Sequence, residues 1–255
     1  ERGSSVKQRT ADVESFFKFG ILNPESNIQF GAGGAGTFSD GKLNTGTHDG
    51  RIRFVLQQLV RFGAPAHIAW DAKPHVGTDV LVRVVKAMRE HILALGGEIR
   101  FLTRFTGFET AEDGSVCAVL AERDGRAERI ACKDLILAPG HSARDTFAML
   151  HARGVPLERK AFSMGVRIEH LQKQVDMAQY GRADLPLPPA DYKLVRHLDD
   201  RTVYTFCMCP GGYVVAAASE EGRVVTNGMS YADRAGDNAN AALLVSLNPK
   251  DFPGE

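Results

Sequence analysis

Residues 135–147 read LILAPGHSARDTF, and this stretch gives the strongest indication of the fold class. Its first four residues form a continuous apolar run, which is typical of a strand covered on both faces in a parallel sheet. Pro139-Gly140 then predicts a tight turn, and Ser142 with Asp145 predicts an approximate capping box at the start of a helix. A strand, a tight turn and a helix in this order predict an α/β fold whose ligand lies at the C-terminal edge of the sheet.

Upstream of this stretch, the sequence predicts helices and then short strands. Apolar residues recur with helical spacing in residues 52–59 and 80–95, and residues 9–19 predict a shorter helix. Thr78 is the predicted N-cap of the helix over 80–95. Four short β-type runs separated by turn pairs such as Asp-Gly then predict a small antiparallel meander: 99–101, 103–108, 116–121 and 130–132.

The pattern changes to strands after Pro156, which places a domain boundary near residues 155–160. Residues 238–255 are expected to be a loop or the beginning of another element. The β-branched and aromatic runs that predict strands are 162–168, 202–208, 213–218 and 224–229.

Composition narrows the functional class. The 255 residues suffice for one large domain or two modest ones. Lys plus Arg and Asp plus Glu both number 31, so the net charge gives no attraction to nucleic acid or to an acidic membrane. Four cysteines without a CxxC pair predict a reducing, cytoplasmic location. No run approaches the roughly 18 apolar residues of a membrane span, and a chain that begins at Glu1 without Met is expected to be part of a longer protein.

The Gly31–Gly36 segment, GAGGAG, has the letters of a dinucleotide-binding GxGxxG loop. Its context is wrong, because residues 37–42 lack the helical period that should follow. One interpretation is therefore a flexible cluster of turns. The other is a loop whose small residues let backbone N–H groups approach a ligand, with Ser39 and Lys42 adding polar contacts.

Histidine and cysteine supply further candidates. His141 lies in the turn after the predicted buried strand and is either a surface residue or a ligand contact. Cys207 and Cys209 should point to the same face of a strand with parallel Cβ vectors, which argues against a dithiol relay. They are structural thiols, pocket-lining residues, or redox or metal groups. Cys117 and Cys132 lie on the distant meander, so no metal site is predicted.

Arg167 and Glu169 should share one strand face. A salt-bridged pair is one explanation. The alternative is that they hold an anionic or polar substrate together with Lys193.

Long strings across the chain resemble an uncharacterised bacterial family of FAD-dependent dehydrogenases, similar in layout to flavoproteins of the glutathione reductase type. The strings are ERG (1–3), SNIQFGAGGAGTFSDGKL (26–43), KPHVGTD (73–79), APGHSARDTF (138–147), GVRIEH (165–170), FCMCPGGYVVAAASEEG (206–222) and NGMSYADRAGDNANAALLV (227–245).

The resemblance implies a domain division and a reaction. Residues 1–157 would form a partial FAD/NAD(P)-binding, Rossmann-like domain with a β-meander. Residues 158–255 would form an inserted, mainly antiparallel β (α+β) substrate domain. The whole protein would be an oxidoreductase that passes hydride between FAD and a small-molecule substrate, with NAD(P)H as the electron source. The alternatives are a non-catalytic flavin- or nucleotide-binding module and an inactive truncated domain.

The resemblance also implies site residues. Glu1 would bind the adenosine ribose and Phe105 would offer backbone to the adenine. The other implied cofactor-binding residues are Arg2, Gly33, Gly34, Ser39, Lys42, Ala138, Pro139 and Gly140. The candidate proton donors are Cys209, His141 and Tyr192, and Arg167, Cys207 and Pro210 would face the substrate.

The family's first strand and its glycine fingerprint precede the position of Glu1. This chain alone is therefore expected to bind FAD weakly or not at all and to be inactive by itself. Its oligomeric state is not predicted.

Overall fold

The computed structural model describes residues 1–252, which divide into two compact units. Unit 1 comprises residues 1–35, 89–158 and 217–223, and unit 2 comprises residues 36–88, 159–216 and the chain from Val224 onward. Both units are thus discontinuous in sequence. The division into a cofactor domain (1–157) and a substrate domain (158–255) concerns what each part binds and stays a prediction.

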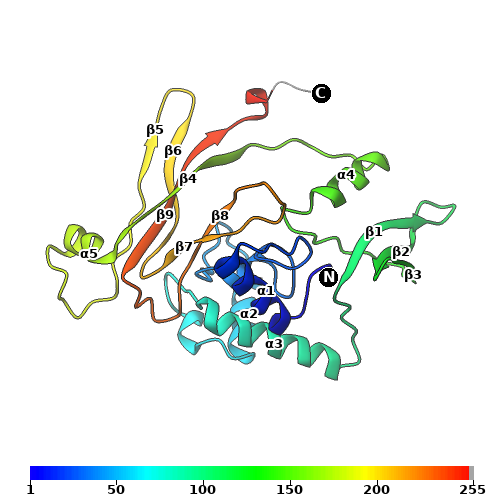
Figure 1. Ribbon diagram of the computed structural model, residues 1–255, viewed down its shortest axis with the longest axis horizontal. Coiled ribbons are helices and arrows are strands. Elements are labelled where there is room, and N and C mark those ends of the chain that lie inside the picture. Colours follow the sequence, from blue (N-terminus) through cyan, green and yellow to red (C-terminus); the bar gives the residue numbers. More distant parts are fainter. Residues whose placement is uncertain (253–255) are drawn as a thin grey trace. The chain divides into compact units, whose positions relative to one another are not determined.

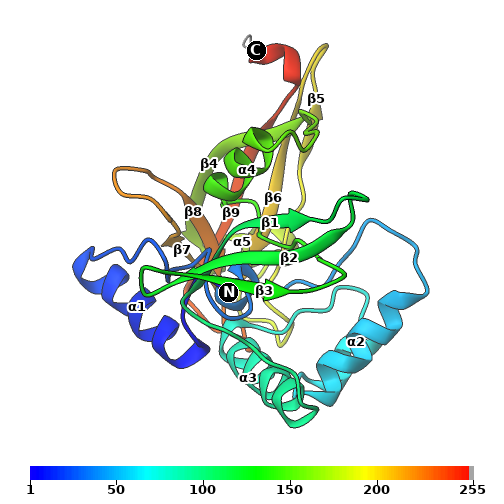
Figure 2. The same ribbon diagram turned by 90° about the vertical axis from the view of Figure 1, so that its right-hand side faces the viewer.

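Unit 1 contains the predicted meander (Figure 2). Three of the four predicted runs are strands, and they pair in sequence order and antiparallel, as the turn pairs between them indicated. The strand predicted at 99–101 is wrong, because these residues are in no strand. The helix predicted over 9–19 begins earlier and ends before Gly20, which has the left-handed φ of 69° that suits a helix C-terminus. The elements of unit 1 are α1 (Val6–Phe19), β1 (Thr103–Thr110), β2 (Val116–Arg123), β3 (Arg126–Ala131) and α4 (Arg144–Ala152).

The buried parallel strand predicted at residues 135–138 is wrong. These residues are in no strand, Ile136 is 92% exposed, and every strand pair between residues 1 and 252 is antiparallel. An apolar run becomes a central strand only where neighbouring strands accept its backbone hydrogen bonds, and the described chain provides none beside it. The mixed α/β composition is confirmed, whereas a Rossmann-like parallel sheet is not found in this part of the chain.

The capping box predicted at the start of α4 is also wrong. The N-cap position is Ala143, without a side-chain hydrogen bond to the helix. Asp145 accepts the N–H of Thr146 at 2.9 Å and forms an ion pair with Arg2, so a distant cation takes the carboxylate that the local pattern assigned to capping.

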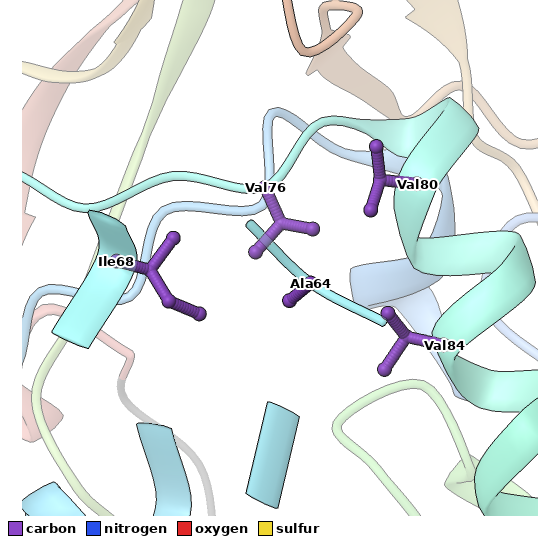
Figure 3. Close-up of a cluster of buried hydrophobic side chains, with 5 residues drawn as sticks. All are labelled: Ala64, Ile68, Val76, Val80 and Val84. Carbon is purple, nitrogen blue, oxygen red and sulfur yellow. The ribbon is translucent and has the colours of Figure 1, made fainter. Parts of the chain in front are cut away.

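Unit 2 contains helix α2 (Arg51–Arg61) and the first turns of α3 (Thr78–Ala94), close to the predicted helices over 52–59 and 80–95. Thr78 is not an N-cap, because its hydroxyl donates to Thr37 O at 2.7 Å. Short 3-10 helices occur at Ala35–Phe38, Ala66–Ala69 and Pro249–Asp251. Val80 and Val84 of α3 form a buried apolar cluster with Ala64, Ile68 and Val76 (Figure 3).

Unit 2 also contains a four-stranded antiparallel sheet in the order β4-β9-β6-β5 (Figure 1). The strands predicted over 162–168 and 202–208 are present, and residues 238–247 are a full central strand where a loop or an incomplete element was expected. Helix α5 was not predicted. The elements are β4 (Phe162–Leu171), α5 (Gln172–Tyr180), β5 (Val195–His197), β6 (Thr202–Cys209), β9 (Asn238–Leu247) and a separate pair, β7 (Tyr213–Ala216) with β8 (Thr226–Met229).

One face of this sheet packs against α5. Val175 of α5 lies in a buried cluster with Met208 of β6 and Ala239 and Ala241 of β9. Since side chains alternate along a strand, Asn240 and Cys209 belong to the opposite face. Within residues 1–252, no helix is both long enough and apolar enough to cross a membrane.

Candidate functional site

A hollow of about 550 Å³ lies within unit 1. Its size is in the usual range for small-molecule sites. Five segments supply its walls: the start of the chain, the glycine loop with the two residues before it, the beginning of β1, the extended segment after β3 and the first turn of α4. The residues around it are Glu1, Arg2, Gln29, Phe30, Gly34, Ala35, Thr103, Arg104, Phe105, Thr146 and residues 135–143.

Glu1 is held at the edge of this hollow by backbone contacts. The Glu1 carbonyl accepts from Thr103 N at 3.0 Å, and the Gly3 carbonyl accepts from Leu102 N at 3.1 Å, so the first residues run beside the start of β1. The Glu1 carboxylate accepts the N–H groups of Gly3 at 2.8 Å and Gly31 at 3.0 Å. Both bonds use Oε1, which leaves Oε2 to accept from a ligand.

Arg9 stabilises the conformation of the glycine loop, although it was not among the candidate residues predicted from the sequence. Its guanidinium is fully buried and donates to four backbone carbonyls, those of Asn27, Ile28, Ala32 and Gly34, at 2.6–2.9 Å. Burial lowers the pKa of Arg9 to about 10, against the opposing charge of Glu1. A sequence signal exists: the buried positions of α1 are 6, 9 and 13, which is the spacing of one helix face.

The Gly31–Gly36 segment forms turns that lead into a short 3-10 helix, which confirms that it is not a strand-to-helix dinucleotide fingerprint. Gly31, Gly33 and Gly34 have φ values of 120°, 81° and 60°, which favour glycine. Gly34 lines the hollow, whereas Gly33 is not among the lining residues.

Arg2 lines the hollow, and its guanidinium already forms ion pairs with two carboxylates. Its guanidinium pairs with Glu25 at 2.8 Å and with Asp145 at 2.9 Å, and it lies 4.3 Å from the centre of the Phe30 ring. Burial acts to lower the pKa of Arg2, but the hydrogen bonds to Glu25 and Asp145 outweigh it and raise that pKa. This arrangement fixes the orientation of Arg2 at the cavity wall.

A second cluster of charged groups lies in unit 2 around Asp40, which is fully buried. The Asp40 carboxylate pairs with Arg234 at 2.6 Å and with Lys42 at 2.8 Å, and it accepts from the Ser230 hydroxyl. Burial acts to raise the pKa of Asp40, but the two cations outweigh burial and lower it. Asp40 is therefore ionised, and it holds Lys42 in place.

Ser39 and Lys42, which the resemblance placed near the cofactor, belong to this second cluster or its approach. The Ser39 hydroxyl donates to Gly36 O at 2.7 Å and accepts from Gly41 N at 3.0 Å, so it closes a local turn. Lys42 Nζ lies 3.7 Å from Cys209 Sγ. Neither residue lines the hollow of unit 1.

Cys207 and Cys209 do not lie on a regular strand, so the premise that they share a face with parallel Cβ vectors is wrong. The register of β6 with β9 skips between Phe206 and Cys209, and Cys207 has a φ of 46°. The Cys209 thiol donates to Cys207 O at 3.2 Å. A β-bulge changes the direction in which the neighbouring side chains point. The alternation of side chains along a strand does not predict where a bulge occurs.

Arg167 and Glu169 take separate partners and not each other. Arg167 Nη1 donates to Cys207 O at 3.2 Å and to Asn240 Oδ1 at 2.5 Å. Glu169 accepts from Val214 N at 2.7 Å and from the Asn238 amide at 2.8 Å. Arg167 thus belongs to the cysteine cluster, whereas Glu169 fixes neighbouring backbone and an amide.

The remaining candidates are spread over both units. The Tyr192 ring stacks with that of His170 at 5.6 Å and packs against the cluster that contains Met208, so Tyr192 lies on the opposite sheet face from Cys209. Burial raises the pKa of Tyr192. His141 lines the hollow of unit 1 and is exposed.

Two further predicted substrate contacts lie in unit 2. Pro210 is buried directly after β6, and Lys193 is exposed. Among residues 1–252, no three His, Cys, Asp or Glu side chains gather closely enough to hold a metal ion.

Comparisons with known proteins show that part of the chain is similar to an FAD-dependent family. Residues 161–255 match the family described as FAD-dependent protein, C-terminal domain-like. An uncharacterized protein of Clostridium beijerinckii (strain ATCC 51743 / NCIMB 8052) is 51% identical over 258 residues, which cover 100% of this chain and 48% of that protein. The coarse resemblance to FAD-dependent proteins is therefore confirmed, whereas the dehydrogenase activity and the nicotinamide nucleotide stay predictions.

One solved structure, the crystal structure of FqzB, is also similar, with a TM-score of 0.36 and 15% sequence identity over 99% of this chain and 55% of that chain. A likeness of this size carries no argument about fold or function. The chain spans about half the length of the relative and of that structure.

Proposed function

We propose that the protein to which this chain belongs is an FAD-dependent oxidoreductase that passes hydride between flavin and a small-molecule substrate, with NAD(P)H as the electron source. The match of residues 161–255 to an FAD-dependent family supports the cofactor. The observation that carries the proposal to particular residues is the hollow of unit 1, which is lined both by a fixed carboxylate and by apolar side chains.

The hollow fits the adenosine part of FAD in chemistry as well as in size. Ribose hydroxyls need an acceptor, and Glu1 Oε2 is available at the edge of the hollow. A flat purine needs apolar walls, which the side chains of residues 135–137 and Pro139 supply.

Each lining segment has a role in this proposal. Glu1 accepts hydrogen bonds from the ribose, Phe105 offers backbone groups to the adenine, and the turn at residues 138–140 lies along the cofactor. Arg2 holds the wall, and the glycine loop with Gly33 and Gly34 brings backbone close to the cofactor because it carries no side chains there. When bound, the flavin supplies the two-electron hydride chemistry.

The substrate-side roles fall to unit 2. Arg167, Cys207 and Pro210 are proposed to face the substrate, with Cys209 as a proton donor. Tyr192 lies on the other face of the same sheet, so Tyr192 and Cys209 cannot both serve one substrate atom from this sheet. His141 remains the candidate proton donor in the hollow of unit 1.

The first test is FAD binding by Glu1→Gln in the longest natural form of the protein that can be purified. Glutamine keeps the size of the side chain but loses the charge that strengthens a hydrogen bond to a hydroxyl. We expect the Kd for FAD to rise roughly tenfold in a fluorescence titration. Glu112→Gln, at an exposed turn between β1 and β2, is the control and should bind as the unmodified protein does. Equal affinity for all three proteins would remove Glu1 from the cofactor site.

The second test separates an enzyme from a flavin-binding module without turnover. Anaerobic addition of NADPH or NADH should bleach the flavin absorbance bands of an oxidoreductase. Bound flavin that stays oxidised with both nucleotides would favour the non-catalytic module. Absence of any bound flavin, in the purified protein and after FAD is added, would overturn the cofactor assignment itself.

A further inference from the structure

The end of β6 contains a single-residue bulge centred on Cys207. Phe206 pairs with Ala242 and Cys209 pairs with Asn240, so three steps on β6 oppose two on β9. Cys207 takes up the extra residue with its left-handed φ of 46°. A non-glycine residue in this region is uncommon, and such strain persists only where surrounding contacts hold it.

Two donors stabilise this bulge by hydrogen bonding to the same carbonyl oxygen, that of Cys207. The Cys207 carbonyl accepts from Arg167 Nη1 and from the Cys209 thiol, both at 3.2 Å. Arg167 is in turn fixed by Asn240 Oδ1. A Cβ atom built at Gly228 would lie 2.9 Å from Cys209 Sγ and close to both Arg167 and Asn240, so these groups converge at one point beside β8.

The charges around the two thiols favour a thiolate. Lys42 Nζ lies 3.7 Å from Cys209 Sγ, and its position is set by buried Asp40, whose own charge is shared between Lys42 and Arg234. The pKa of Cys207 is lowered to about 6, first by a hydrogen bond from the Cys209 thiol and then by the charges of Lys42 and Arg167, which outweigh burial and Asp40. The same hydrogen bond and burial raise the pKa of Cys209.

The two thiols also differ in access. Cys207 is partly exposed, whereas Cys209 is fully buried. An external reagent therefore meets Cys207 first, and the Cys209 thiol lies behind it, where it donates to the Cys207 carbonyl at 3.2 Å. This is the order that a nucleophilic thiolate and a resolving thiol require.

We propose that Cys207 and Cys209 form a thiol–disulfide exchange site that reduces small disulfide substrates. The proposal rests on the geometry of unit 2 alone and does not require FAD.

The reaction balances without another reagent. The Cys207 thiolate attacks one sulfur of a disulfide RSSR, forming a mixed disulfide and releasing one RS⁻. Cys209 then loses its proton to the released thiolate, and the Lys42 ammonium stabilises the Cys209 thiolate that forms. Attack of this thiolate on the Cys207 sulfur breaks the mixed disulfide and releases the second RS⁻. In total, the Cys207 thiolate, the Cys209 thiol and RSSR give one protein disulfide, one RSH and one RS⁻, so two electrons pass from the protein to the substrate.

The test uses 5,5′-dithiobis(2-nitrobenzoic acid) as the disulfide and a Cys117→Ser/Cys132→Ser background, so that only the pair in β6 can react. At pH 7 we expect two thionitrobenzoate ions per chain in a fast phase, and a protein mass that falls by two hydrogens without an adduct. Cys209→Ser should release one thionitrobenzoate and keep a mixed disulfide at Cys207. Cys207→Ser should lose the fast phase.

Other outcomes would overturn the proposal. Adducts on both cysteines of the background protein would show that the thiols do not reach each other, and a fast phase that survives in Cys207→Ser would show that the wrong sulfur was assigned. Circular dichroism and thermal unfolding check that each serine variant is folded. The rates should not change when FAD is added, so a failed flavin assignment leaves this result interpretable.

Lys42 is a positioning residue in this proposal, and a pH profile tests its role. The fast phase should titrate with an apparent pKa of about 6. In Lys42→Met this pKa should move upward towards the ordinary thiol value of roughly 8.5, and Lys42→Arg should restore most of the shift. Lys7→Met, at an exposed position of α1, is the matched control. An unchanged profile in Lys42→Met would contradict the electrostatic part of the proposal.

Discussion

Two fully buried charges, Arg9 in unit 1 and Asp40 in unit 2, are stabilised in different ways. Arg9 donates to four neutral backbone carbonyls of one loop. Asp40 pairs with two cations and a hydroxyl. The charge of Arg9 is thus balanced by oriented dipoles, whereas the charge of Asp40 is balanced by other charges.

The pKa values of Arg9 and Asp40 show whether the surroundings of each charge outweigh the effect of burial. Burial lowers the pKa of Arg9 to about 10, because the opposing charge of Glu1 does not outweigh it. The pKa of Asp40 is lowered in spite of burial, because the cations outweigh it. Arg9 therefore serves mainly to hold a backbone conformation, and Asp40 serves to place the ammonium of Lys42 beside a sulfur.

The largest effect is expected when the Arg9 donors are removed. Arg9→Met fills similar space but leaves four buried carbonyls without this partner, and we expect a loss of about 4 kcal/mol in the free energy of unfolding. Urea denaturation measures the loss. Arg126→Met, at the exposed start of β3, is the control and should change stability little. A loss of less than about 1 kcal/mol in Arg9→Met would mean that the loop holds its own conformation.

Asp40→Asn should cost somewhat less, about 3 kcal/mol, because the amide keeps part of the hydrogen bonding while two cations lose their partner. The pH dependence gives the sharper test. The folded pKa of Asp40 is below its unfolded value of 3.8, so its contribution is complete above that pH and is lost as pH falls through the folded pKa. Asp40→Asn should remove this part of the acid destabilisation. Asp49→Asn, in an exposed pair with Arg51, should change little, and identical acid profiles for Asp40→Asn and the unmodified protein would contradict the assignment.

Two glycine substitutions compare how rigid the surroundings of these charges are. Gly31 has a φ of 120°, and an added Cβ would collide with the Arg9 side chain, which four hydrogen bonds keep from moving. Gly41 has a φ of 68°, and its nearest neighbour would be the flexible end of Leu81 at 2.8 Å. We expect Gly31→Ala to cost about 2 kcal/mol and Gly41→Ala about 1 kcal/mol in thermal or urea unfolding. The reverse order would mean that the loop around Asp40 is the stiffer of the two.

Local periodicity predicted much of the secondary structure of both units. Helices α1, α2 and α3 and the β1–β3 meander follow from spacing and turn pairs, because these signals act between near neighbours in sequence. The predicted strand at 135–138 failed because a strand depends on partners that no local pattern contains. The caps at Thr78 and Ser142 failed for a similar reason, since distant groups determine which polar side chains are free to cap.

The sequence predicted only those parts of the candidate site that are formed by residues close together in the chain. The sequence indicated that residues 138–140 form a ligand-facing turn, and they line the hollow together with Glu1 and Phe105. Charged residues are usually exposed, so nothing marked Asp40 as buried, and the bulge at Cys207 depends on its register with β9. Arg9 was not predicted as a site residue, although positions 6, 9 and 13 have the spacing of one helix face and so indicate that Arg9 is on the buried face of α1.

The strand order β4-β9-β6-β5 has a consequence for how the chain folds. The inner strand β9 is the last of these four strands to be synthesised, and both of its neighbours precede it by long stretches of chain. β4 and β6 therefore leave the ribosome as open edges and wait for a partner that closes long loops when it pairs. Pairing of this sheet is expected to be slow, and aggregation during synthesis is expected mainly in the interval before residue 247 emerges.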